Sequence, residues 1–63
     1  MEDHKAYLDE QYKLAYLDYK TAHTEDELWD ARKRMAQVER TASEIYGFEY
    51  ADSLHRKYLG KNA

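Results

Sequence analysis

The sequence His-Thr-Glu-Asp-Glu at residues 23–27 separates two apolar ladders and contains the most specific helix-start signal in the chain. Thr24 and Glu27 have the spacing of a capping box, in which the Thr side chain accepts from the Glu27 amide and the Glu side chain returns to the Thr24 amide. Glu25 and Asp26 would then occupy the first helical turn, where the helix dipole favours carboxylates. The segment therefore predicts a turn followed by the start of a second helix.

Apolar residues recur at alternating steps of four and three on both sides of this turn. An apolar residue every 3.5 positions, on average, places a continuous stripe along one side of a helix. Two such helices joined by a short turn predict an antiparallel hairpin, with Ala15 and Val38 buried near the middle of the shared seam. The first ladder comprises Leu8, Tyr12, Ala15, Tyr19 and Ala22, and the second comprises Leu28, Ala31, Met35, Val38, Ala42 and Ile45.

Capping residues set the expected ends of the two helices. The first helix is expected over about residues 3–22, with Asp3 as its N-cap. The second is expected over about residues 25–46, because Gly47 is well placed as a left-handed C-cap. Phe48 would then fold back onto the end of the apolar stripe.

A short third helix is expected over about residues 49–59, with Ala51, Leu54 and Tyr58 on one side. The alternative is one kinked helix that continues through Gly47, at a cost of about 1 kcal/mol for the glycine. The apolar phase fits both arrangements, and we favour the break. The sequence therefore predicts an all-α fold, consisting of an antiparallel hairpin and a short C-terminal helix in one domain over residues 1–63.

Length and composition restrict how such a chain can be stabilised. A chain of 63 residues buries a small core, and the absence of Cys excludes disulfides and Cys-based zinc sites. Charged residues make up 37% of the chain but the net charge is only −3, which argues against a dedicated nucleic-acid binder. No segment has the length and apolar character of a membrane span, and the N-terminus does not resemble a signal peptide, so we expect a cytoplasmic protein without a cofactor.

A second apolar stripe lies on the first helix, roughly opposite the ladder, and comprises Tyr7, Leu14 and Leu17. One interpretation is that the C-terminal segment folds back and covers this stripe with Phe48, Leu54, Tyr58 and Leu59. The other is that a second copy or another protein covers it. Because the chain is so short, we favour a homodimer in which two hairpins form a four-helix bundle.

Seven tyrosines in 63 residues are far more than a soluble protein usually has. Tyrosine is enriched at interfaces, because it combines a broad ring with one hydroxyl. Tyr12, Tyr16 and Tyr19 could instead pack their rings in a thin bundle and place their hydroxyls in solvent. Tyr7 and Tyr50 have the character of interface residues.

Trp29 lies off the second ladder, on a line with Lys33 and Arg40 at helical spacing, and Arg32 flanks that line. One interpretation is structural: Trp29 caps the end of the hairpin, and the basic residues form a solvated face paired with neighbouring carboxylates. The second is a protein partner, since Trp and Arg dominate binding hot spots. The third is nucleic acid, held by ring stacking and phosphate contacts.

No pattern in the sequence is typical of an active site or a metal site. The nucleophile elbow, the glycine-rich phosphate loop and a Cys/His pairing are all missing, and Asp52 with His55 supplies only two potential ligands. We therefore expect a small non-enzymatic protein-binding module. Its layout resembles small dimeric hairpin proteins of phages and plasmids in size and topology alone, which does not determine function. We expect a regulator or inhibitor that acts through helix-face contacts. The alternatives are a nucleic-acid-associated factor that uses the Trp29 surface and a structural subunit of a larger assembly.

Overall fold

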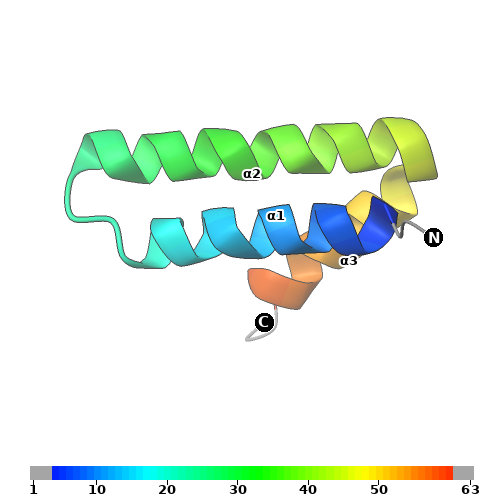
Figure 1. The fold of residues 1–63 in the computed structure, drawn as a ribbon, viewed down its shortest axis with the longest axis horizontal. Coiled ribbons are helices and arrows are strands. Elements are labelled where there is room, and N and C mark those ends of the chain that lie inside the picture. The colour runs from blue at the N-terminus through cyan, green and yellow to red at the C-terminus, as the bar shows by residue number, and fades with distance from the viewer. Residues whose placement is uncertain (1–3, 61–63) are drawn as a thin grey trace.

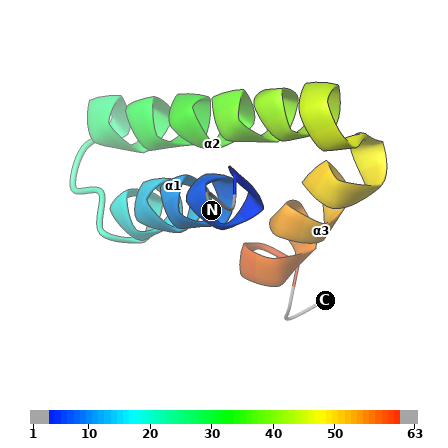
Figure 2. The ribbon, with the colours of Figure 1, turned by 45° about the vertical axis from the view of Figure 1, so that its right-hand side comes forward.

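The computed structural model describes residues 4–60, and this part of the chain folds into three α-helices (Figure 1). Helix α1 spans His4–Lys20, α2 spans Glu25–Tyr46 and α3 spans Phe48–Tyr58. α1 and α2 lie side by side and run in opposite directions, and α3 turns back from the far end of α2 (Figures 1 and 2). The predicted all-α hairpin with a short third helix is confirmed. The expected N-cap, Asp3, lies outside the described residues.

The turn between α1 and α2 has the predicted cap at Thr24, whose side-chain oxygen accepts from the Glu27 amide at 3.1 Å. The second half of the predicted capping box is wrong. The Glu27 carboxylate accepts from the His23 amide at 2.9 Å, one residue further back than expected. The reciprocal bond therefore holds the residue before the cap rather than the cap itself.

Helix α1 ends two residues earlier than the predicted residue 22. The Thr21 amide and the Thr21 hydroxyl both donate to the Leu17 carbonyl, at 3.0 Å and 2.9 Å. A hydroxyl that bonds four residues back competes with the regular backbone pattern. Ala22 and His23 consequently belong to the turn rather than to the helix.

The apolar ladders form the seam between α1 and α2, and Ala15 is 1% exposed there, as predicted. Val38 is only half-buried, and Ile45 is 51% exposed, so the residues toward the C-terminal end of the second ladder are not buried in the seam as predicted. The cause is periodicity: a 3.5-residue repeat on a straight helix drifts by about 20° per heptad. The rungs Ala31, Val38 and Ile45 are seven residues apart and rotate progressively out of the seam. The buried residues of the three helices are Leu8, Tyr12, Ala15, Ala31, Met35, Ala42, Ala51 and Leu54.

Gly47 alone joins α2 to α3, with φ 101° and ψ 163°. This conformation has a positive φ but an extended ψ, so the predicted left-handed cap is wrong. The extended ψ makes Phe48 the first residue of α3 rather than a residue that folds back. The Phe48 side chain is 74% exposed, which also contradicts its predicted place on the stripe.

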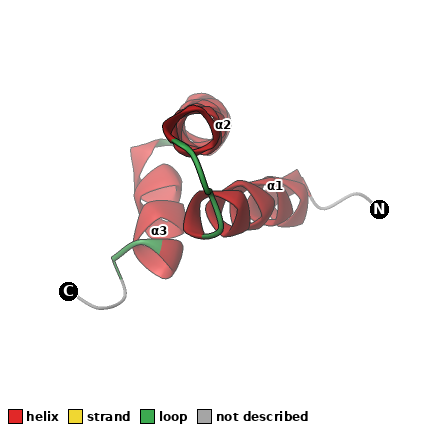
Figure 3. Cartoon of the chain, turned by 90° about the vertical axis from the view of Figure 1, so that its left-hand side faces the viewer, coloured by secondary structure: helices red, strands yellow, loops and turns green. Residues whose placement is uncertain are grey.

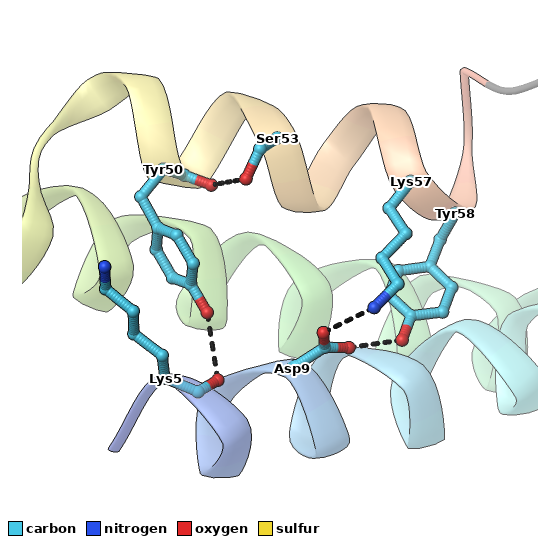
Figure 4. A network of polar contacts seen from close by, with 6 residues as sticks. All are labelled: Lys5, Asp9, Tyr50, Ser53, Lys57 and Tyr58. Carbon is cyan, nitrogen blue, oxygen red and sulfur yellow. Dashed lines mark hydrogen bonds and ion pairs between the residues drawn. The ribbon is translucent and has the colours of Figure 1, made fainter. Parts of the chain in front are cut away.

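Helix α3 packs beside α1 and beneath α2, as the view along the hairpin shows (Figure 3). It buries Ala51 and Leu54, and its Tyr58 ring packs against the Tyr12 and Tyr16 rings of α1 at centroid distances of 5.6 Å and 5.7 Å. Polar contacts with α1 accompany this packing (Figure 4). The Tyr50 hydroxyl donates to the Lys5 carbonyl at 2.9 Å. Asp9 accepts from Lys57 and Tyr58; the Lys57 Nζ is 2.6 Å from the carboxylate. We call Asp9, Lys57 and Tyr58 the Asp9 clasp.

With α3 in this position, the second apolar stripe of α1 stays exposed. Tyr7, Leu14 and Leu17 remain 56%, 44% and 46% exposed. The interpretation that the C-terminal segment covers them is therefore wrong for this structure, because α3 lies against the flank of α1 that carries Asp9 instead.

Candidate interaction surfaces

The predicted partner-binding residues Trp29, Arg32, Lys33 and Arg40 are all exposed on α2, and we call them the Trp29 face. The Trp29 side chain is 58% exposed, so it does not close the end of the hairpin. The Arg32 guanidinium lies 5.2 Å from the centre of the Trp29 ring, within the range of a cation–π contact. This contact holds a cation and an aromatic ring together at the surface.

Neighbouring basic residues pair with carboxylates in part. Arg34 reaches Asp18 of α1 at 2.5 Å and Asp30 at 3.5 Å, so it bridges the two helices and does not join the Trp29 face. Arg40 lies 3.6 Å from Glu44, one turn further along α2. Exposed pairs of this kind contribute about 0–1 kcal/mol each and rearrange readily when a partner approaches.

A groove of about 450 Å³ between α2 and α3 continues the Trp29 face toward the end of the molecule. Ala36 and Arg40 line one wall, and Phe48 and His55 line the other. The sequence predicts the Phe48 ring on the end of the apolar ladder, whereas the structure places it in this groove. The sequence does hold a signal for this position: residues compatible with a helix follow Gly47 directly, so a new helix can begin at Phe48.

Glu39 lines this groove and connects all three helices. Its carboxylate accepts from the Tyr12 hydroxyl of α1 at 2.5 Å and lies 3.3 Å from the His55 Nδ1 of α3. Tyr12 is fully buried, so for this tyrosine the alternative in which the ring packs and the hydroxyl lies in solvent does not hold. Burial, together with the hydrogen bond to Glu39 and its charge, raises the pKa of Tyr12 far above its usual value. Glu39 therefore acts as a structural acceptor.

The pair Asp52 and His55 is divided between two other partners. Asp52 lies 2.9 Å from Arg56 on its own helix, and His55 faces Glu39. Within residues 4–60, no group of three or more His, Cys, Asp or Glu side chains could hold a metal ion.

The predicted self-association residues, Tyr7, Leu14 and Leu17, form the second candidate surface, which we call the α1 stripe. The Tyr7 ring stacks on His4 with a centroid distance of 5.9 Å and an interplanar angle of 9°. Tyr50, the other predicted interface tyrosine, is instead half-buried and bonded to the Lys5 carbonyl.

No protein-family model, curated protein or solved structure matches the chain. Of the three helices in the part that the structure describes, none is both long enough and apolar enough to cross a membrane.

Proposed function

We propose that this chain is a small non-enzymatic protein-binding module, a regulator or inhibitor in the cytoplasm, that self-associates through the α1 stripe. One observation carries the proposal: with α3 docked, Tyr7, Leu14 and Leu17 are still 56%, 44% and 46% exposed on one helix. Large apolar side chains grouped on one face are typical of an interface. A second copy would cover this face and complete a four-helix bundle of two hairpins.

The composition of the core supports self-association. Ala15, Ala31, Ala42 and Ala51 are among the buried residues, and each buries little apolar area. A chain of 63 residues with such a core has little stability of its own. Association through the α1 stripe would bury leucine and tyrosine surface and so raise the stability of the folded chain.

The Trp29 face is proposed as the surface for a different protein. Trp and Arg are enriched among the residues of binding hot spots, and here the Trp29 ring and the Arg32 guanidinium already form a cation–π contact. The face is open and lies beside the α2–α3 groove, which suits a helix or an extended segment of a partner. A binding role also fits the polar groups that contact other helices, since Tyr12 bonds to Glu39 of α2 and Asp9 bonds to Lys57 of α3, so both have structural roles.

Sedimentation equilibrium of the wild type and two leucine variants tests the self-association. We expect a wild-type dimer whose melting temperature rises with protein concentration. Leu14→Lys should be monomeric while it keeps its helix content, because a lysine is tolerated on a free helix face but not in an apolar interface. Leu59→Lys is the matched control, since Leu59 is 36% exposed at the end of α3, and it should remain a dimer. A wild type that stays monomeric at high concentration would refute the proposal.

Nucleic acid is the second candidate ligand for the Trp29 face, favoured by the contact between Arg32 and Trp29. Fluorescence anisotropy with a single-stranded oligonucleotide at low and at physiological salt separates the two. Phosphate-driven binding weakens steeply with salt, whereas capture of a protein through aromatic anchors changes little. Salt-sensitive binding that Trp29→Ala abolishes would replace the protein-partner assignment. Assembly far beyond a dimer in sedimentation would instead indicate a structural subunit.

A further inference from the structure

The junction between α2 and α3 consists of a single residue with an unusual backbone conformation. Gly47 is the only residue within 4–60 that has a positive φ. Its φ of 101° with ψ of 163° lies in a region that is essentially restricted to glycine. The Gly47 amide donates to the Ser43 carbonyl at 2.9 Å, so the α2 hydrogen-bond pattern already reaches the junction. The Ala51 amide lies 3.4 Å from the Gly47 carbonyl, so the α3 pattern begins there.

Only the dihedral angles of Gly47 therefore separate α2 and α3 from one continuous helix. The chain contains no proline, and the space around a Cβ at position 47 is open to 4 Å. A helical φ and ψ at this residue would join the two helices end to end. Such a helix would carry α3 away from its own hairpin. It would expose the surface of α1 and α2 on which α3 packs, which we call the α1–α2 groove.

The receiving groove is specific for α3. It takes Ala51 and Leu54 into the core, and the Lys5 carbonyl accepts from the Tyr50 hydroxyl. Asp9 provides the carboxylate for Lys57 and Tyr58 (Figure 4). These groups belong to the hairpin and stay in place when α3 leaves, so the surface fits an α3 from another chain as well as its own.

We propose that the α1–α2 groove accepts α3 of a second copy, by exchange about Gly47, and that this glycine keeps the closed chain favoured over the intertwined dimer. Exchange of an identical element costs little, since every intramolecular contact is re-formed between chains. A one-residue connection is the type of hinge at which such exchange occurs. This dimer uses a different surface from the α1 stripe, so it is independent of the proposed function.

Two synthetic chains that differ only in the chirality of residue 47 test the hinge, both made with Leu14→Lys so that the α1 stripe does not contribute. L-alanine disfavours the positive φ and favours the continuous helix. D-alanine has the mirror-image preferences, for which φ 101° is ordinary extended backbone, and it retains the closed junction. Sedimentation should give a dimer dissociation constant for the L-alanine chain that is at least about tenfold lower than for the D-alanine chain.

Isotope-filtered NMR on mixed labelled and unlabelled chains identifies the contacts that the dimer uses. The rings of Tyr12 and Tyr58 lie 5.6 Å apart between centroids, close enough for proton–proton cross-peaks. In the intertwined dimer these cross-peaks should connect different chains, and in the D-alanine chain they should stay within one chain. The proposal is overturned if the L-alanine chain folds as a monomer, if its dimer keeps the Tyr12–Tyr58 contact within one chain, or if it unfolds without associating.

Discussion

The α1–α2 seam and the docking of α3 are held together by different chemistry. The seam is built from two apolar ladders in which small residues such as Ala15, Ala31 and Ala42 let the helices approach closely. Helix α3 contributes Ala51 and Leu54 to the core and the Tyr58 ring to contacts with α1, and tyrosine hydroxyls and the Asp9 carboxylate add polar contacts along α1. Burial of apolar area depends little on pH and salt, whereas hydrogen bonds and ion pairs to a carboxylate depend on both. The seam has carboxylate contacts of its own, from Tyr12 to Glu39 and from Arg34 to Asp18. Because α1 and α2 also supply six of the eight buried apolar residues, we expect the seam to be the more stable part of the fold and α3 the part that pH and salt loosen first.

The largest effect is expected from a charge placed in the seam. Ala15→Glu puts an ionised carboxylate where the side chain is now 1% exposed and has no partner. The free-energy cost of burying an unpaired charge exceeds the small free energy of unfolding of so short a chain. This variant should therefore be unfolded at 25 °C, which circular dichroism would show as a loss of helix content.

Ala6→Glu is the control for that variant, because Ala6 is exposed on the same helix. It should melt within a few degrees of the wild type, since exposed substitutions change stability by about 0.5 kcal/mol or less. A wild-type melting curve for Ala15→Glu would show that the two ladders do not face each other.

The difference between the seam and the docking of α3 also explains which parts of the fold can be predicted from the sequence. Periodicity predicts the seam, because a ladder indicates which side of a helix is buried. The prediction weakens along the second ladder, where Val38 is half-buried and Ile45 is exposed, because the 3.5-residue repeat drifts out of phase. The docking of α3 depends on pairs such as Asp9 with Tyr58 that lie far apart in the sequence and leave no periodic signal. Phe48 was misplaced because both a folded-back end and a new helix are compatible with a glycine at position 47. The Trp29 face was predictable as a surface because it lies off the ladder.

A smaller effect is expected at the turn that sets the register of the seam. Thr24 caps α2 by accepting from the Glu27 amide at 3.1 Å, and Thr24→Ala leaves that amide without its side-chain partner. Loss of an N-cap costs about 0.5–2 kcal/mol in the free energy of unfolding. Urea denaturation should therefore show a lower midpoint with an unchanged m-value.

Thr24→Ser separates the cap from other effects of the substitution, because serine keeps the hydroxyl that accepts from the Glu27 amide. Its denaturation midpoint should stay close to that of the wild type. If both variants lost the same stability, the methyl group of Thr24 rather than its hydroxyl would be responsible, and the turn would be fixed by packing.

The smallest effect is expected from acid acting on the Asp9 clasp. Burial raises the pKa of Asp9, but hydrogen bonds from Lys57 and Tyr58 and the charges of Lys57 and Lys13 outweigh it, so the pKa lies below its ordinary value of 3.8. A carboxylate whose pKa is lower in the folded chain contributes stability that is fully present above its ordinary pKa. That contribution is lost as the pH falls through the folded value, below about pH 4. Because Lys57 is exposed, solvent screening keeps the contribution small.

Asp9→Asn should therefore melt below the wild type at pH 7, and the difference should shrink as the pH falls below 4 and through the lowered folded pKa, where the wild-type carboxylate becomes protonated. Glu10→Gln removes an exposed carboxylate next in the sequence and should follow the wild-type profile at every pH. Hydrogen exchange gives the decisive measurement, because it resolves the helices: in Asp9→Asn at pH 7, the amides of α3 should lose protection while those of the seam keep theirs. Equal loss in α3 and in the seam would mean that the three helices open as one unit, and the distinction between a fixed hairpin and a releasable α3 would have to be abandoned.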